Sequence, residues 1–260
     1  MKDCREEWYD KNAKVAVTIV DVTSAAQELA RGHLAGPTAA HYLTEALASV
    51  ALLGGEMSEK DETVILQAKC SGPLGGYNVE CTAAGTLRGY TEKKILDGFD
   101  GLGKPKDRMV LGDQQIQVTR SVPGRILSQG ISASLDGYFA GSLQRKACLK
   151  VEAAVSDEVE ILEARGILVE DLPDAKGELV CCRVADIRSL AVASRNILKH
   201  LGLEKAELRK TTPLQFACRC SPDRAAQMLA ALSEEERKSL PPTVDITCHM
   251  CGKTFTVKVK

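Results

Sequence analysis

Two close pairs of cysteines near the C-terminus constrain this chain more than any other feature of its sequence. Cys218-Arg219-Cys220 is followed, after residues 221–247, by Cys248-His249-Met250-Cys251. Two such pairs around a short segment are typical of a site in which four thiolates hold one Zn²⁺ in a tetrahedron, with each sulfur about 2.3 Å from the metal. Four thiolates leave no open position for substrate. The spacing therefore predicts a structural or redox-active centre, not a hydrolytic one.

The segment that carries these cysteines, 213–260, is too short to bury a large apolar core of its own. A four-thiolate zinc site contributes on the order of 10–16 kcal/mol of apparent binding free energy, which becomes folding free energy. We therefore expect the segment to unfold when the metal is removed. Thiolates are also the oxidisable form of cysteine, and a disulfide sulfur is a poor ligand, so an oxidant would expel the metal.

Three interpretations of the cysteine pairs compete at this point. The first is a purely structural zinc ribbon. A nucleic-acid-binding ribbon is disfavoured because the whole chain has a formal net charge of −1 and segment 213–260 is only mildly basic. A zinc deaminase is disfavoured because Thr247 precedes Cys248 where that signature has proline, and no His-x-Glu occurs. Cys248 and Cys251 already have ligand spacing, so His249 is not expected to be a ligand.

Composition places the chain among globular proteins that work inside the cell. Apolar residues make up 44% and charged residues 27% of the sequence. The start, MKDCREEWYD, lacks the apolar stretch of a signal peptide, and the apolar run 46–53 is too short to span a bilayer. We expect a cytoplasmic protein whose ten cysteines are reduced, metal-bound or redox-sensing. No nucleophile triad, phosphate-binding loop or carboxylate pair is evident, so no enzymatic activity is expected.

The cysteines outside the two pairs carry a weaker signal. We expect Cys4, Cys70, Cys81 and Cys148 to act as buried or half-buried small apolar residues. Cys70 and Cys81 fall on neighbouring predicted strands and could face each other. Cys181-Cys182 could add redox sensitivity or be incidental.

The remaining pattern predicts strands grouped around few helices, which indicates an α+β architecture with a mainly antiparallel sheet. Ser24 and Gln27 form a possible capping box for the first helix, and the glycine-rich run 72–76 is predicted to connect two strands of a hairpin. Strands are expected over 14–22, 63–70, 77–83, 86–91, 115–120, 148–155 and 158–169, helices over 25–34, 38–53 and 131–145, and a loop over 97–113.

We divide the chain into a core domain over 1–177, a helical linker over 178–212 and a zinc-binding module over 213–260. Apolar residues recur at helical spacing over 183–201, which predicts one amphipathic helix, either packed on the core or acting as a switchable linker. In the last segment the pattern predicts a strand over 214–220, a helix capped by Ser221, a capping box of Ser233 and Glu236, and a hairpin of 244–247 with 254–259.

These motifs together resemble the heat-shock protein 33 family, the redox-regulated holdase chaperones, over most of the chain. The C-terminal signature is the most specific part, and the chain departs from the family at Leu143, where glutamate is usual, and in a short 118–131 segment and linker. The runs that carry the resemblance are 216–221, 245–252, Gly72-Pro73-Leu74-Gly75-Gly76, Arg88-Gly89-Tyr90, and Tyr138-Phe139 with Ser142 and Gln144.

The resemblance implies a chaperone that works without ATP and is inactive while reduced and zinc-bound. It implies that oxidation joins Cys218 to Cys220 and Cys248 to Cys251, releases Zn²⁺, and unfolds the zinc module and linker so that apolar surface is exposed. The implied partners are unfolding client proteins and, when activated, a second copy of the chain, with no nucleic acid and no membrane. The alternative of a different class is a zinc-ribbon adaptor that binds a protein or nucleic acid without a redox switch.

Overall fold

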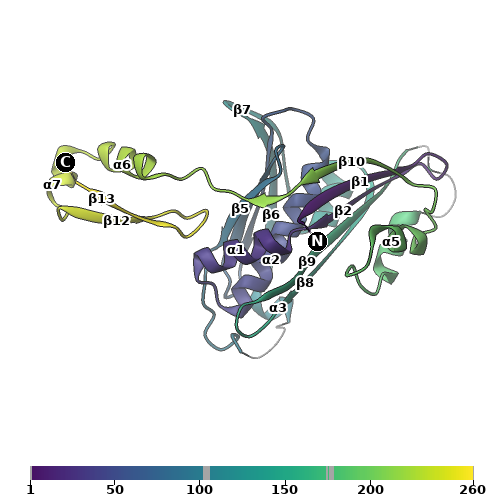
Figure 1. The fold of residues 1–260 in the computed structure, drawn as a ribbon, viewed down its shortest axis with the longest axis horizontal. Helices are drawn as coiled ribbons and strands as arrows, with labels where there is room; N and C mark the ends of the chain where they lie inside the picture. Colours follow the sequence, from purple (N-terminus) through teal and green to yellow (C-terminus); the bar gives the residue numbers. More distant parts are fainter. Residues whose placement is uncertain (1, 102–105, 174, 176–178, 260) are drawn as a thin grey trace.

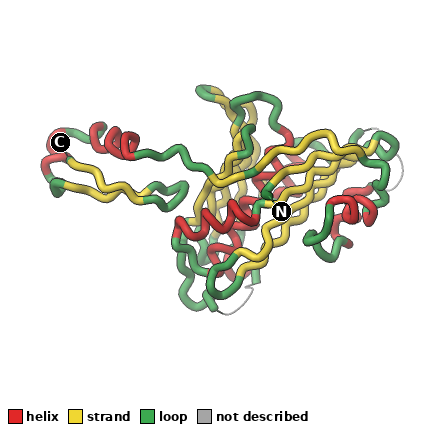
Figure 2. Tube along the Cα trace, viewed as in Figure 1, coloured by secondary structure: helices red, strands yellow, loops and turns green. Residues whose placement is uncertain are grey.

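The body of the protein is built from two mainly antiparallel sheets, as the computed structural model shows for residues 2–101, 106–173, 175 and 179–259 (Figures 1 and 2). The five-stranded sheet has the order β10 (Glu207–Pro213), β1 (Cys4–Asp10), β2 (Val15–Asp21), β9 (Ile161–Asp171) and β8 (Lys146–Val155). The six-stranded sheet has the order β11 (Gln215–Phe216), β5 (Thr86–Thr91), β4 (Gly76–Thr82), β3 (Thr63–Cys70), β6 (Gln114–Val122) and β7 (Arg125–Ser132). The α+β class expected from the sequence is confirmed.

One apolar helix, α2 (Pro37–Leu53), lies between the two sheets. It contacts β3, β4 and β5 on one side and β2, β8 and β9 on the other. Nearly all of its side chains are buried, as expected for a helix that is apolar all round. Helix α1 (Thr23–His33) packs beside it against β5, β9 and β11. The expected helix over 38–53 is therefore confirmed.

The first helix is capped by a residue that the sequence did not single out. The carboxylate of Asp3 accepts hydrogen bonds from the backbone N–H groups of Ser24 (3.0 Å) and Ala25 (2.7 Å). The expected capping box of Ser24 and Gln27 is wrong, because the side chain of Gln27 instead bonds the backbone of Val159 and Ile161. A cap supplied by the residue that precedes β1 is a tertiary contact, which local spacing cannot reveal.

The strand register corrects one expectation about the cysteines. Cys70 lies at the end of β3 beside Gln114, whereas Cys81 pairs with Val64 at the opposite end of the same hairpin. The two thiols therefore do not face each other, and both are free. The run 72–76 does connect β3 to β4, as predicted.

Two of the expected helices are wrong. The helix expected over 131–145 begins inside strand β7, which turns back from β6 at Gly124 and ends at Ser132, and only the short helices α4 (Leu135–Gly137) and η2 (Tyr138–Ser142) follow within that range. The helix over 183–201 is divided into η3 (Val180–Asp186) and α5 (Ser194–His200). Between these two, the backbone of Leu190 is bonded by the side chains of Glu152 and Arg165, which replace helical hydrogen bonds.

The loop over 97–113 contains the short helix α3 (Asp107–Val110), and its residues 102–105 lie outside the described residues.

The outer face of the five-stranded sheet has a separate apolar core. Val17, Ile167 and Val169 from the sheet pack against residues of η3, α5 and their connections, which we call the strap (residues 180–206). The strap is continuous with β10, which returns to the sheet edge beside β1. Residues assigned to the linker by the sequence therefore cover one sheet face and add a strand to it.

The last residues form an arm (residues 217–259) that extends from the body (Figure 1). It contains α6 (Pro222–Ala230), α7 (Glu234–Lys238) and the hairpin of β12 (Thr243–Thr247) with β13 (Thr254–Lys258). Ser221 caps α6, and the capping box of Ser233 and Glu236 is present, as predicted. None of the helices in the described ranges has the length and apolar character needed to cross a bilayer.

We expect Asp3→Ala to destabilise the body by about 1–2 kcal/mol, because two helical N–H groups lose their acceptor. Ser24→Ala, whose side chain caps nothing in α1, should change the free energy of unfolding by less than about 0.5 kcal/mol. Urea unfolding followed by the fluorescence of Trp8 on β1 measures both. Equal losses in the two variants would contradict the assignment of the cap.

Candidate metal centre

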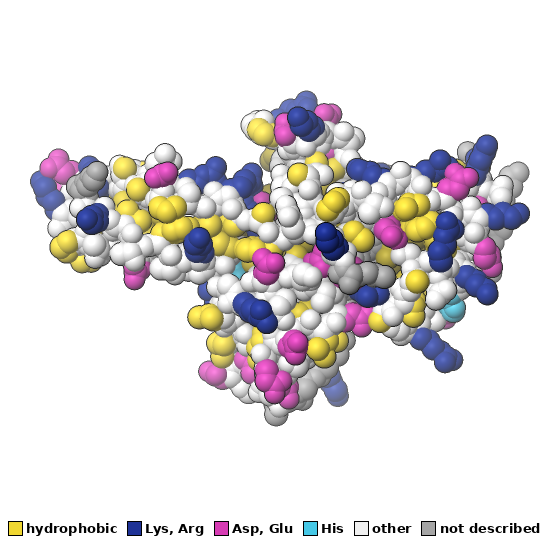
Figure 3. Space-filling view, viewed as in Figure 1, with side chains coloured by type: hydrophobic (Ala, Val, Ile, Leu, Met, Phe, Trp, Pro, Cys, Tyr) yellow, Lys and Arg dark blue, Asp and Glu magenta, His cyan; other side chains and the backbone are white. Residues whose placement is uncertain are grey.

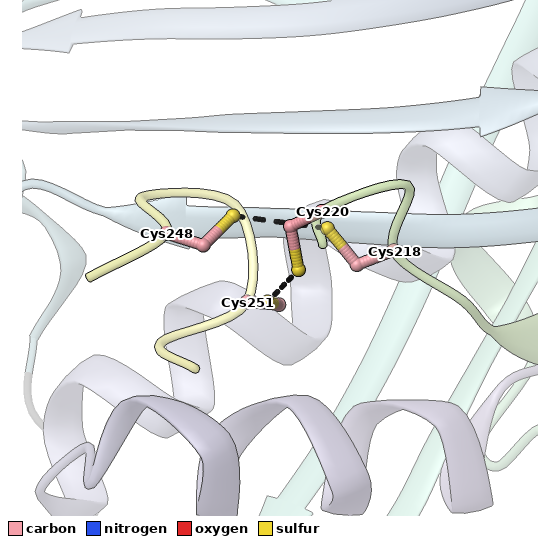
Figure 4. Close-up of side chains that lie close together, drawn as sticks. All are labelled: Cys218, Cys220, Cys248 and Cys251. Carbon is pink, nitrogen blue, oxygen red and sulfur yellow. Dashed lines mark hydrogen bonds between the residues drawn. The ribbon is translucent and has the colours of Figure 1, made fainter. Parts of the chain in front are cut away.

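The four cysteines of the two pairs converge on one point (Figure 4). Cys218 and Cys220 follow β11, and Cys248 and Cys251 lie in the turn between β12 and β13. One Sγ–Sγ distance is 3.8 Å (Cys218 to Cys248) and another is 3.4 Å (Cys220 to Cys251), and all four sulfurs lie within 4.8 Å of one another. The predicted set is therefore assembled as one cluster.

The dimensions of this cluster fit a tetrahedral metal ion. In a tetrahedron with metal–sulfur bonds of about 2.3 Å, neighbouring sulfurs are about 3.8 Å apart. All four thiols are free, and the spacing between them is close to the edge of such a tetrahedron. Four soft donors would select a thiophilic ion over Mg²⁺ or Ca²⁺. Elsewhere in the described ranges, no second group of three or more Cys, His, Asp or Glu side chains comes as close together.

Local backbone structure holds each pair in position. The turn of the second pair is closed by hydrogen bonds from the N–H groups of Cys251 and Gly252 to the carbonyl of Cys248. Gly252 has φ of +72°, a conformation that favours glycine. The first pair follows directly from β11, and the N–H of Ala217 donates to the carbonyl of Leu87 on β5. One pair is thus fixed to the body, and the other is carried by the hairpin of the arm.

The electrostatic surroundings favour the thiolate form of Cys218. Burial raises the pKa of this thiol, but hydrogen bonds from the backbone of Cys220 and from Arg88 outweigh it and lower the pKa to about 7. Burial raises the pKa of Cys220 and Cys251. A thiol that ionises near neutrality is both a ready metal ligand and a ready nucleophile. Cys218 is therefore the thiol of the cluster most disposed to react with an oxidant when no metal is bound.

Arg88 contacts both this thiol and a carboxylate of the body. Its Nη1 lies 3.6 Å from the sulfur of Cys218, and its Nε donates to Glu80 on β4 at 2.5 Å. Glu80 is nearly buried and also accepts a hydrogen bond from Arg219, which lies between the first two cysteines. The two guanidinium groups offset the negative charge that thiolates would place here.

The cysteines also lie where the arm meets the body, in a contact that we call the seam. On the body the seam comprises Gly32, His33, Arg88, Gly89 and Tyr90; on the arm it comprises Cys218 and residues 249–252. The N–H of Gly89 donates to the carbonyl of Met250 (3.1 Å), and the ring of His33 is bonded to the carbonyl of Gly89 (2.7 Å).

Two glycines permit the close approach of the backbones across the seam. A Cβ added at Gly32 would lie 2.6 Å from the carbonyl oxygen of Cys251, and one added at Gly252 would lie 1.9 Å from the carbonyl oxygen of Gly32. The ring of His249 packs edge-on against Tyr90, with 5.6 Å between centroids. His249 thus contributes to docking and lies outside the thiol cluster, as the spacing predicted.

A groove of about 350 Å³ opens beside the cysteines. Its apolar lining comes from α6 and the hairpin, with Ala225, Met228 and Phe255 among its residues. Hydrophobic side chains gather along this arm in the space-filling view (Figure 3). The arm's own buried core is small and consists of Ala225, Leu229 and Val257.

Spacing alone identified the four cysteines but none of the body residues of the seam. Gly32 and His33 lie in unremarkable sequence contexts, and Arg88-Gly89-Tyr90 was noted only as a motif of the family. The remaining six cysteines lie outside the four-thiol cluster, and Cys182 is exposed.

Two sheets around a buried helix, with a C-terminal arm that carries four thiols able to hold a metal ion, define the class of this α+β protein. The model of the Hsp33 protein family matches residues 6–258, and the chain belongs to this family.

Individual relatives support the same family membership. The 33 kDa chaperonin of Thermus thermophilus is 27% identical over 92% of this chain and 79% of its own length, and that of Oceanobacillus iheyensis is 25% identical over 98% and 96%. The crystal structure of the 33 kDa chaperonin (heat shock protein 33 homolog) of Thermotoga maritima has the same fold, with a TM-score of 0.88, 20% identity, and 99% and 95% of the two chains covered.

We expect Cys248→Ser to abolish stoichiometric metal binding, because a serine hydroxyl replaces one of four thiolates. Metal content per chain after purification and dialysis, measured by plasma mass spectrometry, checks this. Cys182→Ser is the matched control, since its thiol is exposed and outside the cluster. Equal metal content in the two variants would exclude Cys248 as a ligand.

We expect Gly32→Ala to weaken the docking of the arm on the body by about 1–3 kcal/mol of free energy. The added methyl group would overlap the carbonyl oxygen of Cys251, which is part of the backbone and cannot rotate away. Alanine improves helix propensity by up to about 1 kcal/mol, so a gain in helix stability opposes the loss of docking. Faster hydrogen exchange at 249–252 with unchanged metal content is the expected result. Gly141→Ala, whose Cβ would meet open space, is the control; unchanged exchange in Gly32→Ala would contradict the seam.

Proposed function

We propose that this protein is a redox-regulated, ATP-independent holdase chaperone. In the reduced state Cys218, Cys220, Cys248 and Cys251 hold one Zn²⁺, and the chaperone is inactive. Oxidation activates it, after which it binds unfolding client proteins and prevents their aggregation. Membership of the Hsp33 family and the names of the relatives support a chaperone, and the position of the four thiols at the seam is the observation that supports the switch.

The thiol chemistry supplies the trigger. A peroxide takes two electrons from two thiolates, which become a disulfide while the peroxide is reduced to water or an alcohol. We assign the disulfides to Cys218–Cys220 and Cys248–Cys251, the pairs that are close in sequence. Each disulfide removes two metal ligands, so the cluster can no longer hold the turn of the hairpin against the cysteines that follow β11. A disulfide across one intervening residue is strained, and strained disulfides are readily reduced, so the switch is reversible.

The small core of the arm explains why loss of the metal would have a large effect. Three buried side chains support the arm, and its sulfurs provide much of its contact with the body. We infer that the arm and the adjacent linker unfold after oxidation and expose apolar surface to clients. The division into a core (1–177), a linker (178–212) and a zinc module (213–260) describes these roles, with β10 and β11 continuing the sheets of the core.

The setting that fits this function is the cytoplasm under oxidative stress, with a dimer as the active form. Nucleic acid and membrane are not among the proposed partners, and no catalysed reaction is proposed. The alternative is an adaptor in which the same zinc site is only a structural support, and the test must distinguish it from a redox-switched chaperone.

We expect peroxide to release Zn²⁺ and, in the same samples, to induce suppression of aggregation of a thermally unfolding client. Zinc release is followed with a chromogenic chelator and aggregation by light scattering, each before and after reduction with dithiothreitol. Chelator-treated protein without peroxide separates metal loss from oxidation. Zinc release without holdase activity would identify a structural adaptor. The absence of both zinc release and holdase activity would refute the switch.

A further inference from the structure

A second group of thiols lies far along the chain from the metal centre, beneath the strap. Cys181 in η3 is buried, with 3% of its surface exposed, and belongs to the apolar core between the strap and the five-stranded sheet. Cys148 on β8 is half-buried and packs against the same core. Neither thiol has a role in the proposed zinc switch.

Strand register places Cys148 on the face that η3 covers. In the pairing of β8 with β9, Cys148 is opposite Val169, and Lys146 is opposite Asp171. Residues two apart on a strand share a face, so Asp171 and Val169 project to the same side as Cys148. Val169 is part of the core beneath the strap, which identifies that side.

Asp171 fixes Cys181 above this face. Its carboxylate is nearly buried and accepts hydrogen bonds from the N–H groups of Val180 (3.0 Å) and Cys181 (2.8 Å). Segment η3 contacts both β8 and β9, which brings Cys181 into the apolar core against which Cys148 packs. Burial raises the pKa of both thiols, so the pair is protonated and stable under reducing conditions.

We propose that Cys148 and Cys181 form a second redox pair, whose disulfide joins the strap covalently to β8. A hydroperoxide oxidises the thiol of Cys148 to a sulfenic acid and leaves as an alcohol or as water. The sulfur of Cys181 then displaces water from the sulfenic acid, forming the S–S bond, and Asp171 is placed to accept the proton from Cys181. The sum is two thiols and one hydroperoxide giving one disulfide, one alcohol and one water.

This disulfide would hold the strap on the sheet after the arm has been released. Its consequence for activity rests on the proposed function: a covalently attached strap limits how much of the linker unfolds, and therefore acts as a brake on the oxidised chaperone. Prolonged oxidation would then give a less active form than brief oxidation.

Peptide mapping of the full-length, metal-loaded protein tests the pair without any variant. The protein is treated with excess hydrogen peroxide, free thiols are alkylated, and the digest is analysed by mass spectrometry without reduction. A cross-linked peptide containing Cys148 and Cys181 supports the proposal. Full alkylation of both residues, or a cross-link of Cys148 to Cys182 in its place, would overturn it.

Variants test the brake. Cys148→Ser should lack the cross-link and keep its full holdase activity on prolonged oxidation, whereas the wild-type protein and the control Cys182→Ser should lose part of theirs. Identical time courses in all three would overturn the brake. If oxidised wild-type protein shows no holdase activity at any time, the proposed function fails, while the peptide map still decides whether the pair forms.

Discussion

The contact among four sulfurs is the interaction on which the placement of the arm depends. Cys251 is buried in the main core of the body, and the other three cysteines pack against that core, whereas the arm has only three buried apolar residues of its own. Ordering a residue costs about 1–2 kcal/mol in backbone entropy alone, so this small core cannot hold segment 217–259 by itself. The packing of the four sulfurs, and a metal ion bound by them, would supply the remaining stabilising free energy.

The geometry of the seam makes docking sensitive to small changes at the sulfurs. Gly32 and Gly252 bring two backbones so close that neither position has space for a Cβ. Backbone atoms in such contact cannot rearrange as flexible side chains do, so a displaced turn loses two further contacts together: the bond from Gly89 to Met250 and the packing of His249 on Tyr90. A local change in the turn therefore weakens the seam as a whole.

Sequence reasoning succeeded where local spacing carries the information and failed where distant segments decide. Four cysteines at ligand spacing, the helix over 38–53 and the capping box at Ser233 were predictable, because each depends on neighbouring residues. The cap from Asp3 was missed because Asp3 is distant from α1 in the sequence, and β7 was not predicted, with its last two residues assigned to a helix. The seam was missed for the same reason, since its body residues become adjacent only when α1 and β5 are packed.

The path from the cysteines to the strap constrains how far a change at the metal centre can spread. The arm joins the body through β11, which has two residues, and then through β10, which pairs with β1 along its length. The N–H of Leu214 is also bonded to the carbonyl of Asp3. Release of the arm therefore reaches the strap only if β10 separates from β1. Because the strap covers Val17, Ile167 and Val169, that separation is also the step that would uncover an apolar sheet face. In the proposed switch, the length and pairing of β10 would set the free-energy threshold between undocking of the arm and exposure of this sheet face.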